Sequence, residues 1–361
     1  MSVYETLQQK INSHPIGAPA RPEFIEILHL LFTPEEAEMA THLTFAAQPV
    51  ETISRLSGVS PERVSALCER MARKGLVSSV DRQGVRRYAL LPMFPGLFEY
   101  PFMLPPQEGI DYERLRKLWM EYYENGLGQE IGGSKVSMLR VLPIQKSIDA
   151  KTTVLSFDQV SEYLNRVELF AVGHCPCRRI HRNCDAPSEV CMSFDATAKM
   201  TSSSGASRII SKAEAFEVLR LSEEAGLVHC TSNVADKIEI LCNCCSCCCI
   251  GLGVITRTKG ALSRPESSFH SSVVETACNA CGICVDRCPV DAITVNGVAT
   301  VDTARCIGCG LCASTCPTEA MALVRRPGAM EPPPSGRDWA VQVATEKGRL
   351  EAFLRNLRPT E

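Results

Sequence analysis

Two stretches near the C-terminus share one cysteine pattern: Cys278–Pro289 reads CNACGICVDRCP, and Cys306–Pro317 reads CIGCGLCASTCP. Each follows the spacing C-x₂-C-x₂-C-x₃-C, and a proline comes directly after the last cysteine. Zinc ribbons are built from separated pairs of cysteines, so this repeated run is not zinc spacing. The pattern therefore indicates two polynuclear metal centres held by thiolates.

The segment 271–325 resembles the bacterial two-[4Fe–4S] ferredoxin family over its full length, with every ligand present. The resemblance implies that three cysteines of each motif bind one cubane cluster, whereas the fourth binds the other cluster. The expected ligands are Cys278, Cys281, Cys284 and Cys316 for cluster A, and Cys306, Cys309, Cys312 and Cys288 for cluster B. The resemblance also implies transfer of single electrons at low potential, around −400 mV.

The stretch between the motifs, DAITVNGVATVDTARC (residues 291–306), alternates apolar and polar residues around Asn296-Gly297. An Asn-Gly dipeptide between two alternating segments is a strong signal for a β-hairpin. Small residues between the ligands, such as Gly282 and Gly308, allow backbone N–H groups to approach the cluster sulfides.

Composition indicates what the remaining cysteines do. The chain has 361 residues, a net charge of −3 and 20 cysteines. Its N-terminus, MSVYETLQQK, lacks an apolar signal segment, and its longest apolar run, ILCNCCSCCCIGLGVI, is too short to span a bilayer. We therefore expect a cytoplasmic protein without a membrane span, whose thiols bind metal rather than form disulfides.

Eleven cysteines between residues 175 and 249 lie outside both motifs, and Cys242–Cys249 reads CNCCSCCC. FAVGHCPCRR (170–179) and KIEILCNCCSCCC (237–249) each carry a predicted strand into a C-x-C pair. If the loops that follow these two strands face each other in the fold, they would enclose a thiol-rich site. Arg178 and Arg179, beside the first pair, would stabilise the negative charge of thiolates or a cluster there.

Three interpretations of these cysteines stay open: a third iron–sulfur cluster, a structural zinc ion, or a redox-active thiol site of the persulfide type. One zinc ion would leave at least seven of the eleven thiols unexplained, which favours the cluster. The expected ligands are Cys175, Cys177 and Cys191, with one or more of Cys242, Cys244, Cys245 and Cys247.

Residues 49–90 predict two helices followed by a β-ribbon. Gly58 ends the first helix, Ser60 caps the second and Gly75 ends it. This segment resembles the winged helix-turn-helix modules of bacterial regulators. Eight basic residues against four acidic ones suit contact with phosphate, but the predicted reading helix offers no Asn, Gln or Lys near its start. We therefore expect a docking or structural module, with DNA binding as the alternative.

The order CPCRR, APSEVCMSF, CNCCSCCC and two ferredoxin motifs is similar to a group of proteins from anaerobes. They are described as 4Fe–4S ferredoxin-type proteins with an N-terminal helix-turn-helix. The predicted fold class is α+β and multidomain. Its parts are a winged-helix module (1–100), a cysteine-rich α/β middle domain (101–265), a two-[4Fe–4S] ferredoxin domain (271–325), and a C-terminal tail and helix (326–361).

Together these patterns predict a protein that passes single electrons to or from a partner oxidoreductase. The alternatives are a redox-sensing transcription regulator and an electron-transfer subunit of a larger reductase complex. Whether the chain is itself an oxidoreductase component stays open, because the sequence gives neither catalytic residues nor an oligomeric state. GLGVIT lacks the third glycine of a dinucleotide loop.

Overall fold

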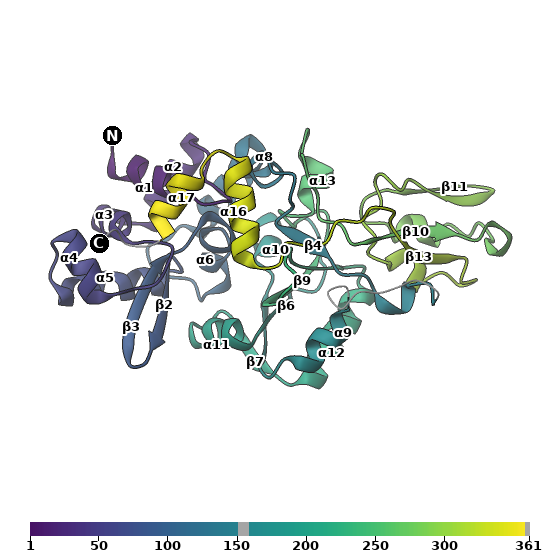
Figure 1. The fold of residues 1–361 in the computed structure, drawn as a ribbon, viewed down its shortest axis with the longest axis horizontal. Coiled ribbons are helices and arrows are strands. Elements are labelled where there is room, and N and C mark those ends of the chain that lie inside the picture. Colours follow the sequence, from purple (N-terminus) through teal and green to yellow (C-terminus); the bar gives the residue numbers. More distant parts are fainter. Residues whose placement is uncertain (151–158, 358–361) are drawn as a thin grey trace.

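The computed structural model describes residues 1–150 and 159–357. Three regions follow one another along its length (Figure 1): helices around the N-terminus, a six-stranded sheet, and β-hairpins with short helices at the far end. Helix and sheet are thus mixed, as predicted. Among the described residues, no helix has the length and apolar character needed to cross a bilayer.

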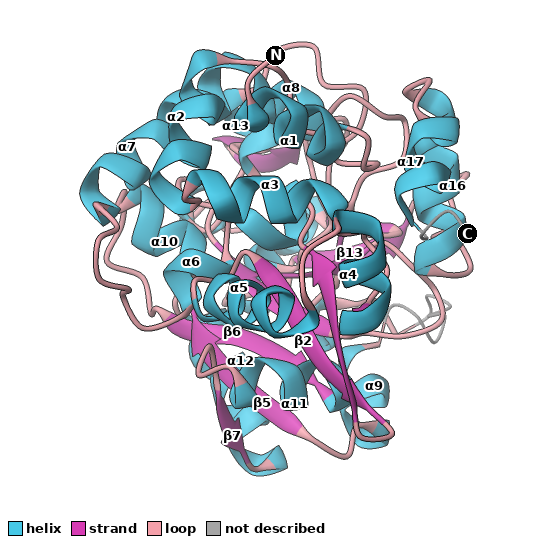
Figure 2. Ribbon diagram, turned by 90° about the vertical axis from the view of Figure 1, so that its left-hand side faces the viewer, coloured by secondary structure: helices cyan, strands magenta, loops and turns pink. Residues whose placement is uncertain are grey.

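The N-terminal region consists of helices that pack on a small antiparallel sheet of order β1-β3-β2 (Figure 2). Its elements are α1 (Val3–Asn12), α2 (Pro22–Leu31), α3 (Pro34–His42), β1 (Gln48–Pro49), α4 (Val50–Ser57), α5 (Pro61–Arg73), β2 (Val77–Arg82) and β3 (Val85–Leu90). Gly58 ends α4 with φ +70°, and the Ser60 hydroxyl accepts a hydrogen bond from the amide of Arg63 at the start of α5. Both positions agree with the prediction from sequence.

The core of this region continues past residue 100. Helices α6 (Tyr100–Met103), α7 (Tyr112–Tyr122) and α8 (Gly128–Ile131) follow it in the chain. The fully buried Trp119 on α7 contacts the rings of Phe24 and Phe98. One apolar cluster extends from Tyr4 on α1 through α7 to Leu311, so packing is continuous across the predicted boundaries at residues 100 and 265.

The middle region is built on a sheet of order β4-β8-β9-β6-β5-β7. Its strands are β4 (Leu139–Val141), β5 (Phe170–His174), β6 (Glu189–Phe194), β7 (Arg208–Ile210), β8 (Val228–Ser232) and β9 (Ile240–Cys244). Its helices are α9 (Val160–Arg166), α10 (Pro176–His181), α11 (Asp195–Ser203), α12 (Lys212–Glu224) and α13 (Gly253–Arg257). Every pairing in the sheet is antiparallel. This differs from the α/β layout predicted for the region, because among the described strands of this sheet no two neighbours are parallel.

The C-terminal region contains two antiparallel strand pairs and two single-turn helices. Its elements are β10 (Phe269–Val273), α14 (Ile283–Asp286), β11 (Ile293–Asn296), β12 (Val298–Val301), α15 (Leu311–Ser314) and β13 (Met321–Arg325). β11 and β12 form the predicted hairpin, and Gly297 adopts φ +74° at its turn. β10 pairs with β13, so the two ends of the region lie side by side.

The chain then returns to the N-terminal end (Figure 1), where α16 (Gly336–Glu346) and α17 (Leu350–Leu357) pack. The amides of Phe45 and Ala46 donate to the carbonyls of Asn356 and Leu357, at 2.9 and 3.1 Å. Glu130 accepts from Lys347 at 2.8 Å and from Arg349 at 2.9 Å. The last helix, which the sequence predicts to be amphipathic, therefore packs within the chain.

His14 lies where α1 meets this last helix. Its ring contacts those of Phe45 and Phe353, with centroids 5.1 and 5.6 Å apart. Burial, assisted by the neighbouring Arg349 and Lys347, lowers the pKa of His14 from 6.5 to about 3. The unfolded chain therefore binds a proton between these values while the folded chain does not, so stability falls as the pH falls below 6.5.

We predict that His14→Gln reduces this acid sensitivity. Between pH 7 and pH 5 the free energy of unfolding of the unsubstituted chain should fall by about 2 kcal/mol more than that of the variant. Anaerobic urea unfolding followed by circular dichroism at both pH values measures the difference. Equal pH dependence in the two proteins would contradict the prediction.

Candidate metal centres

The two cysteine motifs of the C-terminal region surround two separate cavities. One is lined by Cys278, Cys281, Cys284 and Cys316. The other is lined by Cys306, Cys309, Cys312 and Cys288. Each cavity thus takes three cysteines from one motif and the fourth from the other. These are the two sets expected for clusters A and B, and the cavities are called cavity A and cavity B below.

Backbone amides and one hydroxyl point at the sulfur atoms of these cavities. The amide of Ala299 donates to Sγ of Cys278 at 3.4 Å, and that of Ala292 donates to Sγ of Cys288 at 3.2 Å. The hydroxyl of Ser271 lies 3.0 Å from Sγ of Cys312. Such hydrogen bonds stabilise negative charge on a ligand sulfur, and thereby tune a bound cluster.

Glycine is required at two positions between the cysteines that line cavity B. Gly308 has φ +67° and Gly310 has φ +84°, a region that L side chains rarely adopt. A Cβ atom at Gly308 would also overlap the carbonyl oxygen of Phe269. The small residues between the ligands therefore allow neighbouring backbone to approach the cavity closely.

The two cavities differ in their exposure to solvent. Cys306, Cys309 and Cys312 are all buried, whereas Cys281 is exposed. Burial raises the pKa of Cys312 to about 12. A free thiol there would stay protonated at neutral pH, so only a bound cation would hold it as thiolate.

A second set of thiols, which we call the inner thiol group, gathers on neighbouring strands of the middle sheet, with Cys177 on α10 and Cys249 in the segment after β9. Its members are Cys175, Cys177, Cys191, Cys230, Cys242, Cys244 and Cys249. Cys175 directly follows β5, Cys191 lies on β6, Cys242 and Cys244 lie on β9, and Cys230 lies on β8. The order β8-β9-β6-β5 makes these strands adjacent, and Cys230 stands directly opposite Cys242.

The side chains of the inner thiol group form a continuous series of contacts. Cys177 interacts with Cys175 and Cys249. Cys244 interacts with Cys230, Cys242 and Cys249, and Cys242 interacts in turn with Cys191. The interaction with Cys191 lowers the pKa of Cys242, while that with Cys242 raises the pKa of Cys191. Without a cation, a buried set of this kind cannot carry a charge on every sulfur.

A buried carboxyl group belongs to the same surroundings. Glu99 is 8% exposed and accepts a hydrogen bond from the amide of Gly96 at 2.6 Å. Burial, with a contribution from the negative charge of Cys242, raises the pKa of Glu99 to about 8. At neutral pH this group is therefore largely neutral and adds little negative charge beside the thiols.

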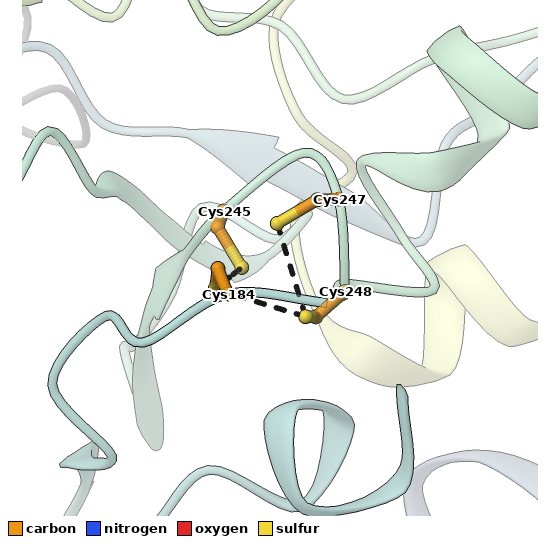
Figure 3. A group of neighbouring side chains, drawn as sticks. All are labelled: Cys184, Cys245, Cys247 and Cys248. Atoms are coloured by element: carbon orange, nitrogen blue, oxygen red, sulfur yellow. Dashed lines mark hydrogen bonds between the residues drawn. The ribbon is translucent and has the colours of Figure 1, made fainter. Parts of the chain in front are cut away.

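A third set, the outer thiol group, consists of Cys184, Cys245, Cys247 and Cys248 (Figure 3). The four Sγ atoms all lie within 4.8 Å of one another. Three members come from the turn after β9, and Cys184 comes from the loop between α10 and β6.

Arg178 lies between the inner and outer thiol groups. It is 5% exposed, and it donates hydrogen bonds to the carbonyls of Pro187 at 2.8 Å and Asn243 at 2.6 Å. Burial lowers its pKa, but the negative charges of Cys175 and Cys245 raise it by more, so the net pKa is raised. Arg178 thus supplies one fixed positive charge to both groups. Arg179 donates instead to the carbonyl of Phe102 at 2.7 Å.

The sequence-predicted ligands of the middle region divide between these two groups. Cys175, Cys177, Cys191, Cys242 and Cys244 belong to the inner group, whereas Cys245 and Cys247 belong to the outer group. Sequence reasoning missed Cys184 and Cys248 of the outer group, and it also missed Cys230 and Cys249 of the inner group. No local signal in the octet separates the sets: Cys245, Cys247 and Cys248 follow the end of β9 and join the outer group. Cys249 follows them in turn but belongs to the inner group.

Comparison with known families identifies the C-terminal region. Residues 277–320 match a family model described as a 4Fe-4S dicluster domain. Neither the curated proteins nor the solved structures gave a match to the chain. The matched range contains all eight motif cysteines that line the two cavities. The C-terminal region of this protein is therefore a ferredoxin-type domain that binds 4Fe–4S cofactors.

Proposed function

We propose that this chain is an electron-transfer protein that passes single electrons through two [4Fe–4S] clusters and a third cluster in the inner thiol group. The observation that carries the proposal is the pair of four-cysteine cavities, each built from both motifs. A cubane bound to four thiolates changes its charge by one electron with little rearrangement of its ligands, which suits it to relay electrons.

The surroundings of the three sites support an order for the transfer. Cavity A includes the exposed Cys281, so cluster A is the natural point of contact with a partner oxidoreductase. Cys306 and Cys309 of cavity B share one apolar cluster with Cys230, Cys244 and Cys249 of the inner thiol group. Cluster B would therefore connect cluster A to the third cluster.

One backbone hydrogen bond connects cavity B with the sheet that carries members of the inner thiol group. The amide of Ile144 donates to the carbonyl of Cys309 at 3.0 Å. Ile144 closely follows β4, which pairs with β8, the strand that carries Cys230. This connection supports a fixed spacing between cavity B and the inner thiol group.

For the third cluster we propose ligands from Cys175, Cys177, Cys191, Cys242 and Cys244. Cys191, Cys242 and Cys244 lie on adjacent strands, and Cys175 and Cys177 lie at the start of α10. These sulfurs come from separate segments, which supports the assignment because the four ligands of a cubane must approach it from different directions. Cys230 and Cys249 then complete the sulfur-rich wall behind it. Free cysteine packs readily in such a buried place.

The N-terminal region is proposed to act as a winged-helix docking or structural module. Its helix, strand and hairpin order supports that comparison. Several of its cations are already paired: Arg63 binds Glu35 at 2.8 Å, Arg70 binds Glu36 at 2.7 Å, and Arg86 binds Glu69 at 3.0 Å. Ion pairs of this kind weaken the attraction for DNA phosphates.

The central test is the metal content of protein purified without oxygen. The full chain should contain about twelve irons and an equal amount of acid-labile sulfide, because each of three cubanes holds four of each. A double substitution, Cys175→Ser with Cys177→Ser, should lower the iron to about eight.

Cys68→Ser provides a matched control, because Cys68 is a buried free cysteine on α5, in the N-terminal region. It should leave the iron content unchanged. About eight irons in the unsubstituted protein would exclude the third cluster, and iron-free protein would exclude the whole proposal.

Ser271→Ala should lower the reduction potential of cluster B. The hydroxyl of Ser271 can donate to Sγ of Cys312, and this bond stabilises the more negative, reduced cluster. Redox titration followed by electron paramagnetic resonance measures the change. Ser314→Ala is the control, because the hydroxyl of Ser314 donates to the carbonyl of Leu311 instead; equal potentials in both variants would contradict the assignment.

The docking interpretation predicts no sequence-specific binding of DNA. Gel-shift experiments with the DNA upstream of the coding region, using reduced and oxidised protein, should show only weak binding that salt removes. Sequence-specific retardation that depends on redox state would favour the redox-sensing regulator instead.

A further inference from the structure

The outer thiol group is more compact than a cubane site requires. Sγ of Cys184 lies 3.7 Å from that of Cys245 and 3.8 Å from that of Cys248, and Sγ of Cys247 lies 3.8 Å from that of Cys248. Figure 3 shows the four side chains converging, with three on one turn and Cys184 on a separate segment.

These separations match a single tetrahedral ion. With zinc–sulfur bonds of about 2.3 Å, the edge of a tetrahedron of four sulfurs is about 3.8 Å. In a cubane, each ligand sulfur lies outside a different iron atom of the cluster, so the four sulfurs stand farther apart. They are also too far apart for a disulfide, in which the sulfurs approach to about 2.05 Å.

The donor atoms of the outer thiol group also favour a single tetrahedral ion. All four donors are cysteine sulfurs, and a tetrahedral set of four thiolates selects zinc or iron over harder cations. Zinc with four thiolates carries a net negative charge. The buried Arg178, whose charge interacts with Cys245, offsets part of it.

Neighbouring contacts already bring the two segments together. The side-chain amide of Asn183 donates to the carbonyl of Cys247 at 3.1 Å, and Arg178 binds the carbonyls of Pro187 and Asn243. An ion at the outer thiol group would add a direct link between the loop that contains Cys184 and the turn after β9. Both segments adjoin strands that carry members of the inner thiol group.

We propose that the outer thiol group binds one zinc ion through Cys184, Cys245, Cys247 and Cys248. The ion has a structural role: it fixes the wall of the inner thiol group without exchanging electrons, since zinc has no redox chemistry. A structural zinc and a third cluster thus lie side by side and use different cysteines.

Elemental analysis of the anaerobically purified full chain, after dialysis against a chelator, tests the site. We expect about one zinc per chain, which Cys184→Ser with Cys247→Ser lowers to near zero, whereas Cys68→Ser leaves it unchanged. A loss of about four irons instead of zinc would overturn the proposal, because it would identify the outer group as a cubane site. A single iron in place of zinc would overturn it as well.

A second measurement needs no variant. X-ray absorption at the zinc edge of the unsubstituted protein should give four sulfur neighbours at about 2.3 Å. Oxygen or nitrogen neighbours, or protein without zinc, would overturn the proposal. Iron content reports on the third cluster separately: one zinc with eight irons would exclude that cluster and leave the zinc site supported.

Discussion

A buried thiolate is stable only beside a positive charge, and much of this structure satisfies that requirement. In cavity B, burial alone would keep Cys312 protonated. In the middle region, Arg178 is only 5% exposed, and its positive charge interacts with both Cys175 and Cys245. One arginine cannot balance a negative charge on each of the eleven sulfurs, so the thiols that bind no cation stay protonated.

The antiparallel sheet determines which sulfurs can share an ion. The strands β6, β8 and β9 each carry at least one cysteine of the inner thiol group, and those residues cannot move independently of the sheet. Where β9 ends, the chain turns, and Cys245, Cys247 and Cys248 approach Cys184 instead. The change from strand to turn within CNCCSCCC therefore divides one dense cysteine run between two sites of different size.

The sequence predicts the local features of this fold well. The spacing in both motifs predicts the two sets of four cysteines that line the cavities. Gly58, Ser60 and Asn296-Gly297 predict the end of α4, the start of α5 and the turn of a hairpin. In each of these cases, the residues that carry the signal lie within a few positions of the feature that they predict. The division of the middle cysteines was not predictable in this way, because it depends on strand order and on Cys184, which is far from the octet in sequence.

The return of α17 to the N-terminal end has a mechanical consequence. The chain enters the dicluster domain from the middle region and leaves it toward Phe45 and Ala46, which hold the last helix by backbone hydrogen bonds. Both ends of the domain are thus anchored, unlike a carrier that swings on a single tether. In the proposed function, a redox partner would therefore approach the face that bears the exposed Cys281, and the clusters would keep fixed positions instead of moving with a mobile domain.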